Sequence, residues 1–511
     1  MRGVVAAGHP LTAEAGRLML EEGGNAFDAV VGAFFAACVA EPVLASPGGG
    51  GYLMARTEDQ KTEFYDFFVN TPQLKKETSD IEFFGIHGDF GESTQEFHVG
   101  LGSVAVPGLI HGISAMHRNL CTLPMKVLME PAVQMARAGV VVNSFQAYVL
   151  DILTPIYTFT EESRKLYGHP ERPNGLLGEG DIFKNPEFAD FLETLGKEGL
   201  PFFTEGVFGH AVETYSRGHG GHLRQNDLRN YETRVTKPLK MDFKRAKLYL
   251  SPPSSSGGLL TGLSLKLMES VDWSGIEPFG MEHLQLLIAC MELTDRGRLD
   301  ALARGDDVFV SSLDPDFTHT YTKWMKGRAS AIKGTTHFSV CDSKGQMASM
   351  TVSNGEGCGY IIPGTGIMLN NMLGEEDLAP FGFHNWKPGQ RMTSMMCPSI
   401  CEGDEGWTWA FGSGGSNRIR TALLQFILNK ICLGMNLDEA INSPRCHFEK
   451  EFLNLESGFQ GWAGLKDQIT RAKVWEERNL FFGGLHCVGK NEGELRGCGD
   501  VRRGGVVGFS G

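Results

Sequence analysis

The chain has 511 residues, of which 41% are hydrophobic and 21% charged, a composition typical of a folded globular protein. Its formal net charge is −14, from 61 acidic and 47 basic residues, and no run of Lys or Arg is longer than two. This pattern argues against nucleic acid or an anionic membrane as a partner, because both select basic stripes, and it favours a small-molecule substrate.

The N-terminal segment does not resemble a targeting sequence. It reads "MRGVVAAGHPL", with one basic residue and a short apolar stretch that Gly, His and Pro interrupt, unlike the continuous apolar region of a secretory signal. The longest apolar run, residues 29–40, is too short to cross a bilayer and is typical of a buried helix. We therefore expect a cytoplasmic protein; a periplasmic location would require that a signal had been trimmed.

Two helices are predicted near the start of the chain. Thr12 is a suitable N-cap for a helix that runs to Glu22, and Asn25 for a second, nearly all-apolar helix that ends before Pro42. The next segment, "SPGGGGYLMAR", has four successive glycines without the G-K-[ST] of a phosphate loop. We interpret these glycines as positions where backbone packs closely against backbone ahead of a strand.

The middle of the chain gives weaker signals. Residues 73–100 are polar and without a clean period, which predicts a surface excursion, and residues 120–330 are predicted to be mostly helical. His219 and His222 lie in a Gly-rich stretch with nothing nearby to complete a ligand set, so a flexible loop is favoured. We expect neither a metal nor a cofactor.

From residue 335 onward the pattern changes to short strands, followed by a helical segment, "NRIRTALLQFILNKI". Strands with helices on both outer sides predict a layered α/β architecture. The turn at 342–345, "DSKG", predicts a hairpin between the first two strands. If Cys341 faces residue 346 or 347, Thr335 lies opposite Val352 or Ser353, so that two hydroxyl groups become neighbours.

Such a hydroxyl pair is also a common stabiliser of sheets, and a nucleophile needs a base in addition. No His or Lys is placed by spacing to serve Thr335. The α-amine of Thr335 itself would serve, because its pKa of about 7.7–8.0 leaves a substantial neutral fraction at physiological pH. This chemistry requires cleavage of the Gly334–Thr335 bond, and Gly334 is suited to it because glycine accepts strained backbone conformations and leaves its carbonyl open to attack.

Acyl transfer also needs donors for the oxyanion. The segment "AFGSGGSNRIR" runs from a strand through a glycine loop into a helix and would leave the backbone N–H groups of Gly415 and Ser416 free near the positive end of that helix. Nucleotide sites and plain tight turns share this pattern, so alone it does not decide the function.

Nine segments in order along the chain together resemble the gamma-glutamyltransferase (glutathione hydrolase) family. They are "GHPLTAEAGRLMLEEGGNAFDAVVGAFFAACVAEP", "GGGGYLMAR", "VAVPGLIHG", "SPPSSSGG", "GTTHFSVCDSKG", "GTGIMLNN", "TSMMCPSI", "GSGGSNRI" and "DVRRGGVVGF". The resemblance implies an N-terminal-nucleophile hydrolase with a four-layer αββα sandwich. It also implies a precursor that cleaves itself into a large subunit (1–334) and a small subunit (335–511), which form a heterodimer.

The same resemblance implies roles for individual residues. Thr335 would be nucleophile and base, Ser353 the partner hydroxyl, and the amides of Gly415 and Ser416 the oxyanion hole. Further positions match residues that bind the substrate in the family: Asn354, either Glu375 or Glu376 for the α-amine, and Thr393 with Ser394 for the α-carboxylate.

Three departures from the family pattern concern recognition of the donor. Phe68 stands where members that use glutathione have a carboxylate-binding arginine, so Arg56 or Arg391 would have to compensate. The acidic pair after "LNN" is shifted, and the segment 377–391 is shorter than the usual lid loop, so we expect a more open cleft. A γ-glutamyl amide such as glutathione is the default donor; a different amide, as in cephalosporin acylases or oxamate amidohydrolases, is the alternative. Hypotheses of other classes are a non-catalytic binding protein on the same fold and, more weakly, a nucleotide-binding protein.

Overall fold

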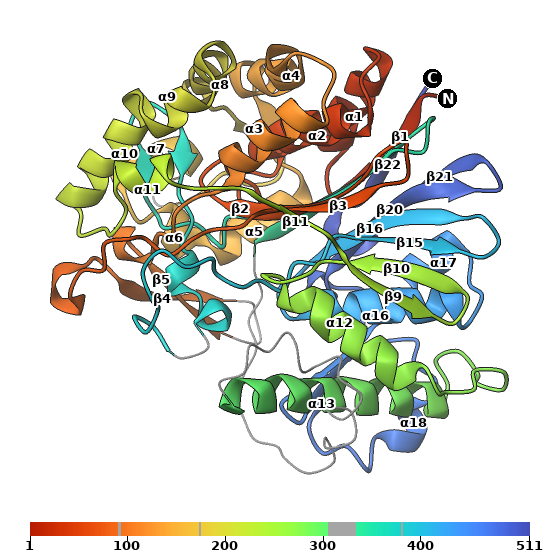
Figure 1. Ribbon diagram of the computed structural model, residues 1–511. Helices are drawn as coiled ribbons and strands as arrows, with labels where there is room; N and C mark the ends of the chain where they lie inside the picture. Colours follow the sequence, from red (N-terminus) through yellow and green to blue (C-terminus); the bar gives the residue numbers. More distant parts are fainter. Residues whose placement is uncertain (90–93, 173–174, 305–333, 380–381) are drawn as a thin grey trace.

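The computed structural model describes residues 1–89, 94–172, 175–304, 334–379 and 382–511. Two antiparallel sheets pack face to face, and a layer of helices covers the outer side of each sheet (Figure 1). This arrangement confirms the predicted αββα sandwich.

The strands of the two sheets come from distant parts of the chain. The first sheet has the order β22 (Val506–Ser510), β1 (Gly3–Ala7), β11 (Thr335–Asp342), β12 (Met347–Ser353), β2 (Gly50–Arg56), β3 (Thr62–Phe67) and β8 (Arg234–Thr236). The second sheet has the order β21 (Glu494–Cys498), β20 (Gly484–Asn491), β16 (Thr408–Gly414), β15 (Ser399–Gly403), β10 (Ala246–Leu250) and β9 (Leu239–Phe243).

The helices divide between the two outer faces. The first sheet is covered by α1 (Pro10–Glu21), α2 (Ala26–Ala40) and α3 (Leu109–Asn119), while α4 (Met125–Ala138) packs on α2 and α8 (Pro186–Glu198) packs on α4. The second is covered by α12 (Ser256–Met268), α16 (Arg418–Ile431) and α17 (Leu437–Asn442), while α13 (Met281–Arg304) packs on the outer side of α12. Smaller helices are α5 (Ser144–Ile152), α6 (Thr154–Tyr157), α7 (Glu161–Tyr167), α9 (Leu200–Thr204), α10 (Val207–Gly218), α11 (Gln225–Arg229) and α18 (Trp462–Leu465).

The start of the chain confirms one predicted cap and corrects the other. Asn25 caps α2 in a capping box with Asp28. The first helix, however, begins at Pro10, and the His9 side chain caps it by accepting from the N–H of Leu11. Proline suits the first helical position because its missing N–H would have no partner there. The hydroxyl of Thr12 instead donates to Glu41 at 2.7 Å.

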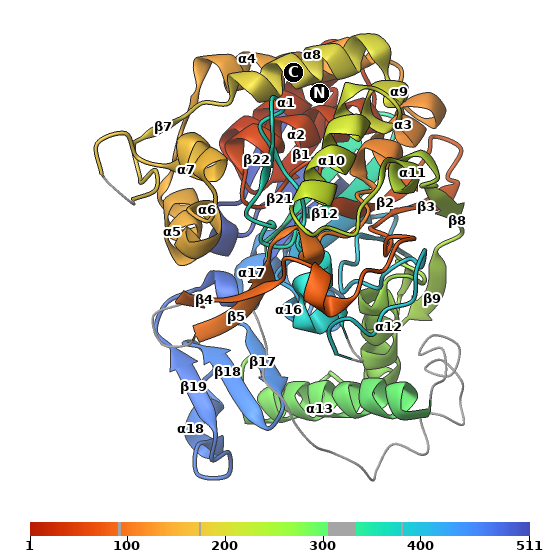
Figure 2. The same ribbon diagram turned by 90° about the vertical axis from the view of Figure 1, so that its left-hand side faces the viewer.

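The structure adds strands to two predicted regions within residues 73–330. The described part of 120–330 is mostly helical, as predicted, but β8, β9 and β10 lie within 234–250, and residues 305–330 lie outside the described residues. These strands occupy edge or near-edge positions, and exposed charged residues interrupt their apolar pattern, as Lys240 and Asp242 do in β9 and Lys247 in β10. The excursion at 73–100 contains a hairpin, β4 (Phe84–Asp89) with β5 (Thr94–Val99), on the side of the molecule facing the viewer in Figure 2.

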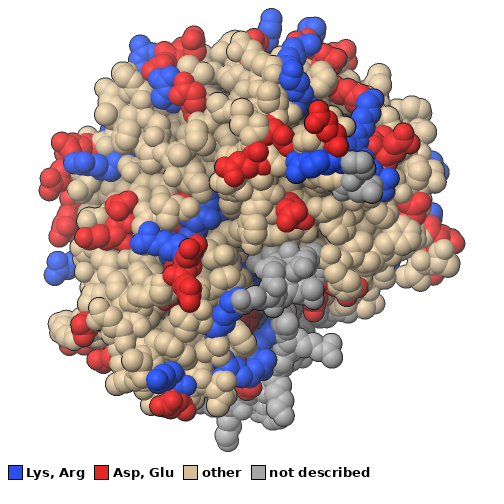
Figure 3. Space-filling model, turned by 180° about the vertical axis from the view of Figure 1, so that it is seen from behind, with Lys and Arg blue, Asp and Glu red and all other residues tan. Residues whose placement is uncertain are grey.

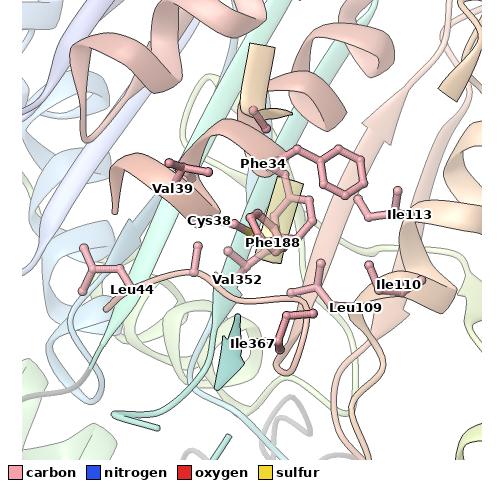
Figure 4. Close-up of a cluster of buried hydrophobic side chains, with 14 of the residues drawn as sticks. Phe34, Cys38, Val39, Leu44, Leu109, Ile110, Ile113, Phe188, Val352 and Ile367 are labelled. Carbon is pink, nitrogen blue, oxygen red and sulfur yellow. The ribbon is translucent and has the colours of Figure 1, made fainter. Parts of the chain in front are cut away.

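The register of the central hairpin resolves the predicted alternatives. Cys341 pairs with Met347, and Thr335 pairs with Ser353 rather than with Val352. Val352 packs into the apolar cluster beneath α2, together with Phe34 and Cys38 (Figure 4). Because side chains alternate along a strand, Ser353 points to the opposite face, toward the second sheet.

The glycine run before β2 also behaves as predicted. A Cβ on Gly49 would lie 2.2 Å from the carbonyl oxygen of Ser353, and one on Gly50 would lie 3.0 Å from the Cα of Phe68. The backbone of this run therefore lies against the strands on both sides, as the sequence analysis proposed.

The two ends of the chain lie side by side in both views (Figures 1 and 2), because β1 and β22 pair antiparallel, with Gly3 opposite Ser510. Strands from before and after residue 334 are thus interleaved in the first sheet, with β1 between β22 and β11, and β12 beside β2. Acidic and basic side chains are interspersed on the face shown in Figure 3. Among the described residues, the helices are too short or too polar to span a membrane.

Candidate active site

The hydroxyl groups of Thr335 and Ser353 meet at the start of β11. Thr335 Oγ1 lies 3.3 Å from Ser353 Oγ, and Ser353 Oγ lies 2.7 Å from the carbonyl oxygen of Gly334. The N–H of Gly355 donates to Ser353 Oγ at 3.1 Å. A hydroxyl has one proton and two lone pairs. Since the Gly334 oxygen can only accept and the Gly355 N–H can only donate, Ser353 donates to Gly334 and accepts from Thr335.

Gly334 is required by its surroundings. A Cβ at this position would lie 2.3 Å from the carbonyl oxygen of Gly355 and 3.0 Å from that of Val43. Only glycine brings this carbonyl close enough to the Ser353 hydroxyl.

His337 is the nearest histidine along β11, and its two ring nitrogens are already occupied. Nδ1 lies 2.8 Å from Thr351 Oγ1, and Nε2 lies 2.8 Å from Ser339 Oγ. Complete burial, with a smaller effect of His486, holds the pKa of His337 well below its usual value. His337 therefore stays neutral within the sandwich, and both of its ring nitrogens are committed to partners other than Thr335.

The glycine loop after β16 lies beside the nucleophile. A Cβ on Gly414 would lie 2.4 Å from the carbonyl oxygen of Thr335. Gly415 has φ of 122° and Ser416 has φ of 54°, and α16 begins two residues later. This left-handed turn lies at the N-terminus of α16, where the helix dipole favours negative charge. The structure thus brings the start of the predicted oxyanion loop, at Gly414, against the carbonyl of Thr335.

The hydroxyl of Ser416 has a partner that the sequence did not suggest. It donates to Asp377 Oδ2 at 2.8 Å. The short segment after Glu376 therefore contacts the oxyanion loop directly, a contact that does not depend on a long lid loop.

The predicted amine-binding residues separate into buried and exposed positions. Glu375 is 4% exposed, and its Oε1 lies 2.5 Å from where a Cβ on Gly355 would be. Glu376, by contrast, is exposed. Asn354 is buried and donates to the carbonyl of Met368 at 3.3 Å. Of the two acidic residues, Glu375 is the one close to the loop that holds Ser353.

The predicted carboxylate-binding pair lies near Phe68. The N–H of Met392 donates to the carbonyl of Val69, and Ser394 pairs with the "SPPSSSGG" segment through the carbonyl of Ser254. Ser394 is buried and accepts from the N–H of Met396, whereas Thr393 is half-buried. The Phe68 ring is 1% exposed and packs 5.6 Å from the ring of Tyr52, so this part of the site is apolar.

Neither candidate arginine is available to replace the charge missing at position 68. Arg56 pairs with Met347 at the far end of β2 and forms a salt bridge with Glu402 at 2.7 Å. Arg391 donates to the carbonyl of Phe68 and to the hydroxyl of Tyr231, and its side chain is 3% exposed. The proposed compensation is therefore wrong for both residues.

Two further polar residues near Thr335 were missed from the sequence. The Arg503 guanidinium donates to the carbonyl oxygen of Thr335 at 3.0 Å, and Glu41 accepts from the Thr336 hydroxyl at 2.9 Å. A lone acid directly after a fifteen-residue buried helix is unusual and would have signalled Glu41. The described residues contain no group of three His, Cys, Asp or Glu placed to hold a metal ion.

Comparisons with known proteins agree with this geometry. Residues 12–510 match the family model described as Gamma-glutamyltranspeptidase. The chain is 29% identical over 482 residues to a glutathione hydrolase proenzyme of Bacillus subtilis, covering 87% of this chain and 80% of that one. It is 28% identical over 484 residues to the Acylase ACY 1 proenzyme of a Pseudomonas species, covering 89% and 84%. The fold is similar to that of a cephalosporin acylase from Bacillus halodurans, with a TM-score of 0.85, 21% identity and coverage of 100% and 96%.

Proposed function

Because the chain belongs to the gamma-glutamyltranspeptidase family and is an enzyme of the hydrolase and transferase type, we propose that it cleaves itself at Gly334–Thr335 and then transfers a γ-glutamyl group through an ester on Thr335. The observation that carries this proposal is the hydrogen-bond chain from Thr335 through Ser353 to the carbonyl of Gly334.

The first step is an N-to-O acyl shift. Thr335 Oγ1 attacks the carbonyl carbon of Gly334, and the Ser353 hydroxyl stabilises the oxyanion that forms on the Gly334 oxygen. The C–N bond then breaks, the hydroxyl proton passes to the leaving nitrogen, and an ester remains. Water hydrolyses this ester to a carboxylate on Gly334 and a free Thr335 with an α-amine.

The second step uses the amine that the first step creates. The neutral α-amine accepts the proton of the Thr335 hydroxyl as the oxygen attacks the substrate amide. The amides of Gly415 and Ser416 stabilise the new oxyanion. The amine then returns its proton to the leaving group, and water or an amino compound releases the acyl group from Thr335.

The two products, 1–334 and 335–511, are proposed to stay together as a heterodimer. The interleaved strand order supports this, because strands of the two products pair at β22–β1, at β1–β11 and at β12–β2 in one sheet. Separation would break three interfaces of that sheet and expose its apolar faces.

The choice of donor rests on the residues around Phe68. Glu375 and Ser394 support a γ-glutamyl donor, since a carboxylate suits the α-amine of the donor and a hydroxyl suits its carboxylate. The buried ring of Phe68 and the engaged guanidinium of Arg391 favour a second candidate, an acylase for a donor without an α-carboxylate. To test this, processed enzyme is incubated with glutathione, glutamine, a cephalosporin side-chain amide and oxamate, and free acid is measured. Glutamate release supports the first candidate, and release of another acid alone supports the second.

The pair Glu375 and Glu376 provides a matched test of the γ-glutamyl subsite. Glu375→Gln is expected to lower kcat/KM for a γ-glutamyl donor by about 10- to 100-fold, because the charge facing the donor α-amine is lost. Glu376→Gln, at an exposed position, is expected to stay within about twofold. A donor lacking the α-amino group should show no difference between the variants. A loss confined to Glu376→Gln would contradict this assignment.

A further inference from the structure

Arg503 is the last residue of η6 (Val501–Arg503), and it reaches back to the nucleophile. Its Nη1 donates to the carbonyl oxygen of Thr335 at 3.0 Å, and its Nη2 lies 3.5 Å from the carbonyl oxygen of Leu480. The residue is 4% exposed. The C-terminal part of the chain thus supplies a buried guanidinium that binds the carbonyl of the same residue whose α-amine cleavage would create.

The surrounding backbone leaves room for this side chain. A Cβ on Gly414 would lie 3.1 Å from Arg503 Nη1, and a Cβ on Gly484 would lie 2.4 Å from Arg503 Cδ. A Cβ on Gly415 would lie 3.5 Å from Nη2. The oxyanion loop and β20 are therefore shaped around the guanidinium, which touches both halves of the catalytic centre.

The salt-bridge pairing of Arg503 also differs from that of the neighbouring arginines. Arg502 forms salt bridges with Glu456 and Asp500, and Arg445 forms one with Asp500. Within the described part of the chain, no carboxylate oxygen lies within 4.0 Å of the Arg503 nitrogens. Burying an unpaired charge costs stability, so its presence at a site indicates a functional use.

We propose that Arg503 is a positioning residue for the nucleophile: its guanidinium fixes the Thr335 carbonyl and, as a buried positive charge, favours the neutral, proton-accepting form of the α-amine that cleavage creates. The inference rests on the proposed function, since it needs Thr335 to be an N-terminus. A chain terminus frays unless it is held, and cleavage removes the covalent tether on one side of Thr335. A like charge disfavours protonation of the amine next to it.

Other charged groups act on the same amine. Glu41 and His486 line the enclosed pocket shared by Thr335 and Arg503. Burial raises the pKa of Glu41 to about 6, although hydrogen bonds from Thr12 and Thr336 act to lower it. Burial lowers the pKa of His486 to about 4. Six further charged groups surround this region. The charges of Arg418, Arg445 and Asp500 act on Arg503. Glu356 and Glu375 lie near Gly355, and Asp377 accepts a hydrogen bond from Ser416. Glu41 lies beside both Thr335 and Arg503, and its negative charge acts on the amine in the opposite sense to Arg503.

The test compares Arg503→Met with Arg503→Lys in the processed two-chain enzyme. The acidic limb of the pH profile, where kcat/KM falls at low pH, reports protonation of the base in the free enzyme. Arg503→Met is expected to move this limb upward by about one pH unit, since the amine gains a proton more readily without the charge. Arg503→Lys keeps a positive charge, so its limb should stay near that of the wild type. A limb that does not move in Arg503→Met, or that moves equally in both variants, overturns the inference.

If Arg503→Met fails to fold or to process, the pH profile of Glu41→Gln provides a second measurement. The amide keeps an acceptor for Thr336 but removes the negative charge, so the acidic limb is expected to move downward. An unchanged limb in Glu41→Gln would overturn the inference in that case. The wild-type enzyme separates this outcome from failure of the proposed function. If the wild type consists of two chains and turns over a donor, the proposed function stands, whether or not the acidic limb shifts in the variants.

Discussion

Replacing Thr335 with alanine is expected to leave the protein as one chain and to lower amide turnover by about 10⁴-fold or more. The alanine removes the hydroxyl that attacks Gly334 and later attacks the substrate, so both reactions lose their nucleophile. Cleavage is followed on a denaturing gel and turnover by release of free acid.

Thr335→Ser is the matched control, because it keeps the hydroxyl and the α-amine and loses only a methyl group. It should still yield chains 1–334 and 335–511. If Thr335→Ala were cut at the same place and at the same rate as the wild type, Thr335 would not be the nucleophile for processing.

Replacing Ser353 with alanine is expected to slow self-cleavage by about 10²- to 10³-fold, the effect of removing one oxyanion donor. Ser353 is the group that donates to the Gly334 oxygen at 2.7 Å while accepting from Thr335. The rate is measured by following loss of the full-length chain after purification of the uncut protein.

Two variants control this result. Ser353→Thr keeps the hydroxyl and should process. Ser349→Ala removes a buried hydroxyl from the same face of β12, one that donates to the carbonyl of Phe411 and does not touch Gly334. Equal slowing by Ser349→Ala and Ser353→Ala would mean that packing of β12, and not the hydrogen bond to Gly334, limits cleavage.

The sequence predicted the parts of the site that depend on local spacing. The hairpin turn fixed the register to within one residue, and the structure selects Ser353 because Val352 belongs to the apolar cluster beneath α2. The turn at Gly415 and Ser416 was predictable for a similar reason, since a strand, a glycine turn and a helix follow one another directly.

Contacts between distant segments were not predictable in the same way. Arg503 reaches Thr335 from 168 residues away, and Glu41 reaches Thr336 from 295 residues away. Such contacts depend on how the two sheets stack, which the period of a single strand does not encode. The same limit explains the error at Arg391, whose position beside Phe68 looked available until its partners, Tyr231 and Asp66, were seen.

The strands at 234–250 were missed for a different reason. They lie at or near sheet edges, and their lysines interrupt the apolar pattern that marks the central strands. Edge strands carry such charges because these discourage pairing with other chains. The sequence signal for a strand is thus weakest where the sheet meets solvent.

Intact-mass analysis of the wild-type protein, before and during turnover of a donor, tests the central claim most directly. The account predicts two polypeptides, 1–334 and 335–511, with Thr335 at the N-terminus of the second, and a transient mass increase of one acyl group on that polypeptide. A single uncut chain that turns over the donor, or an acyl group carried at a residue other than Thr335, would contradict it.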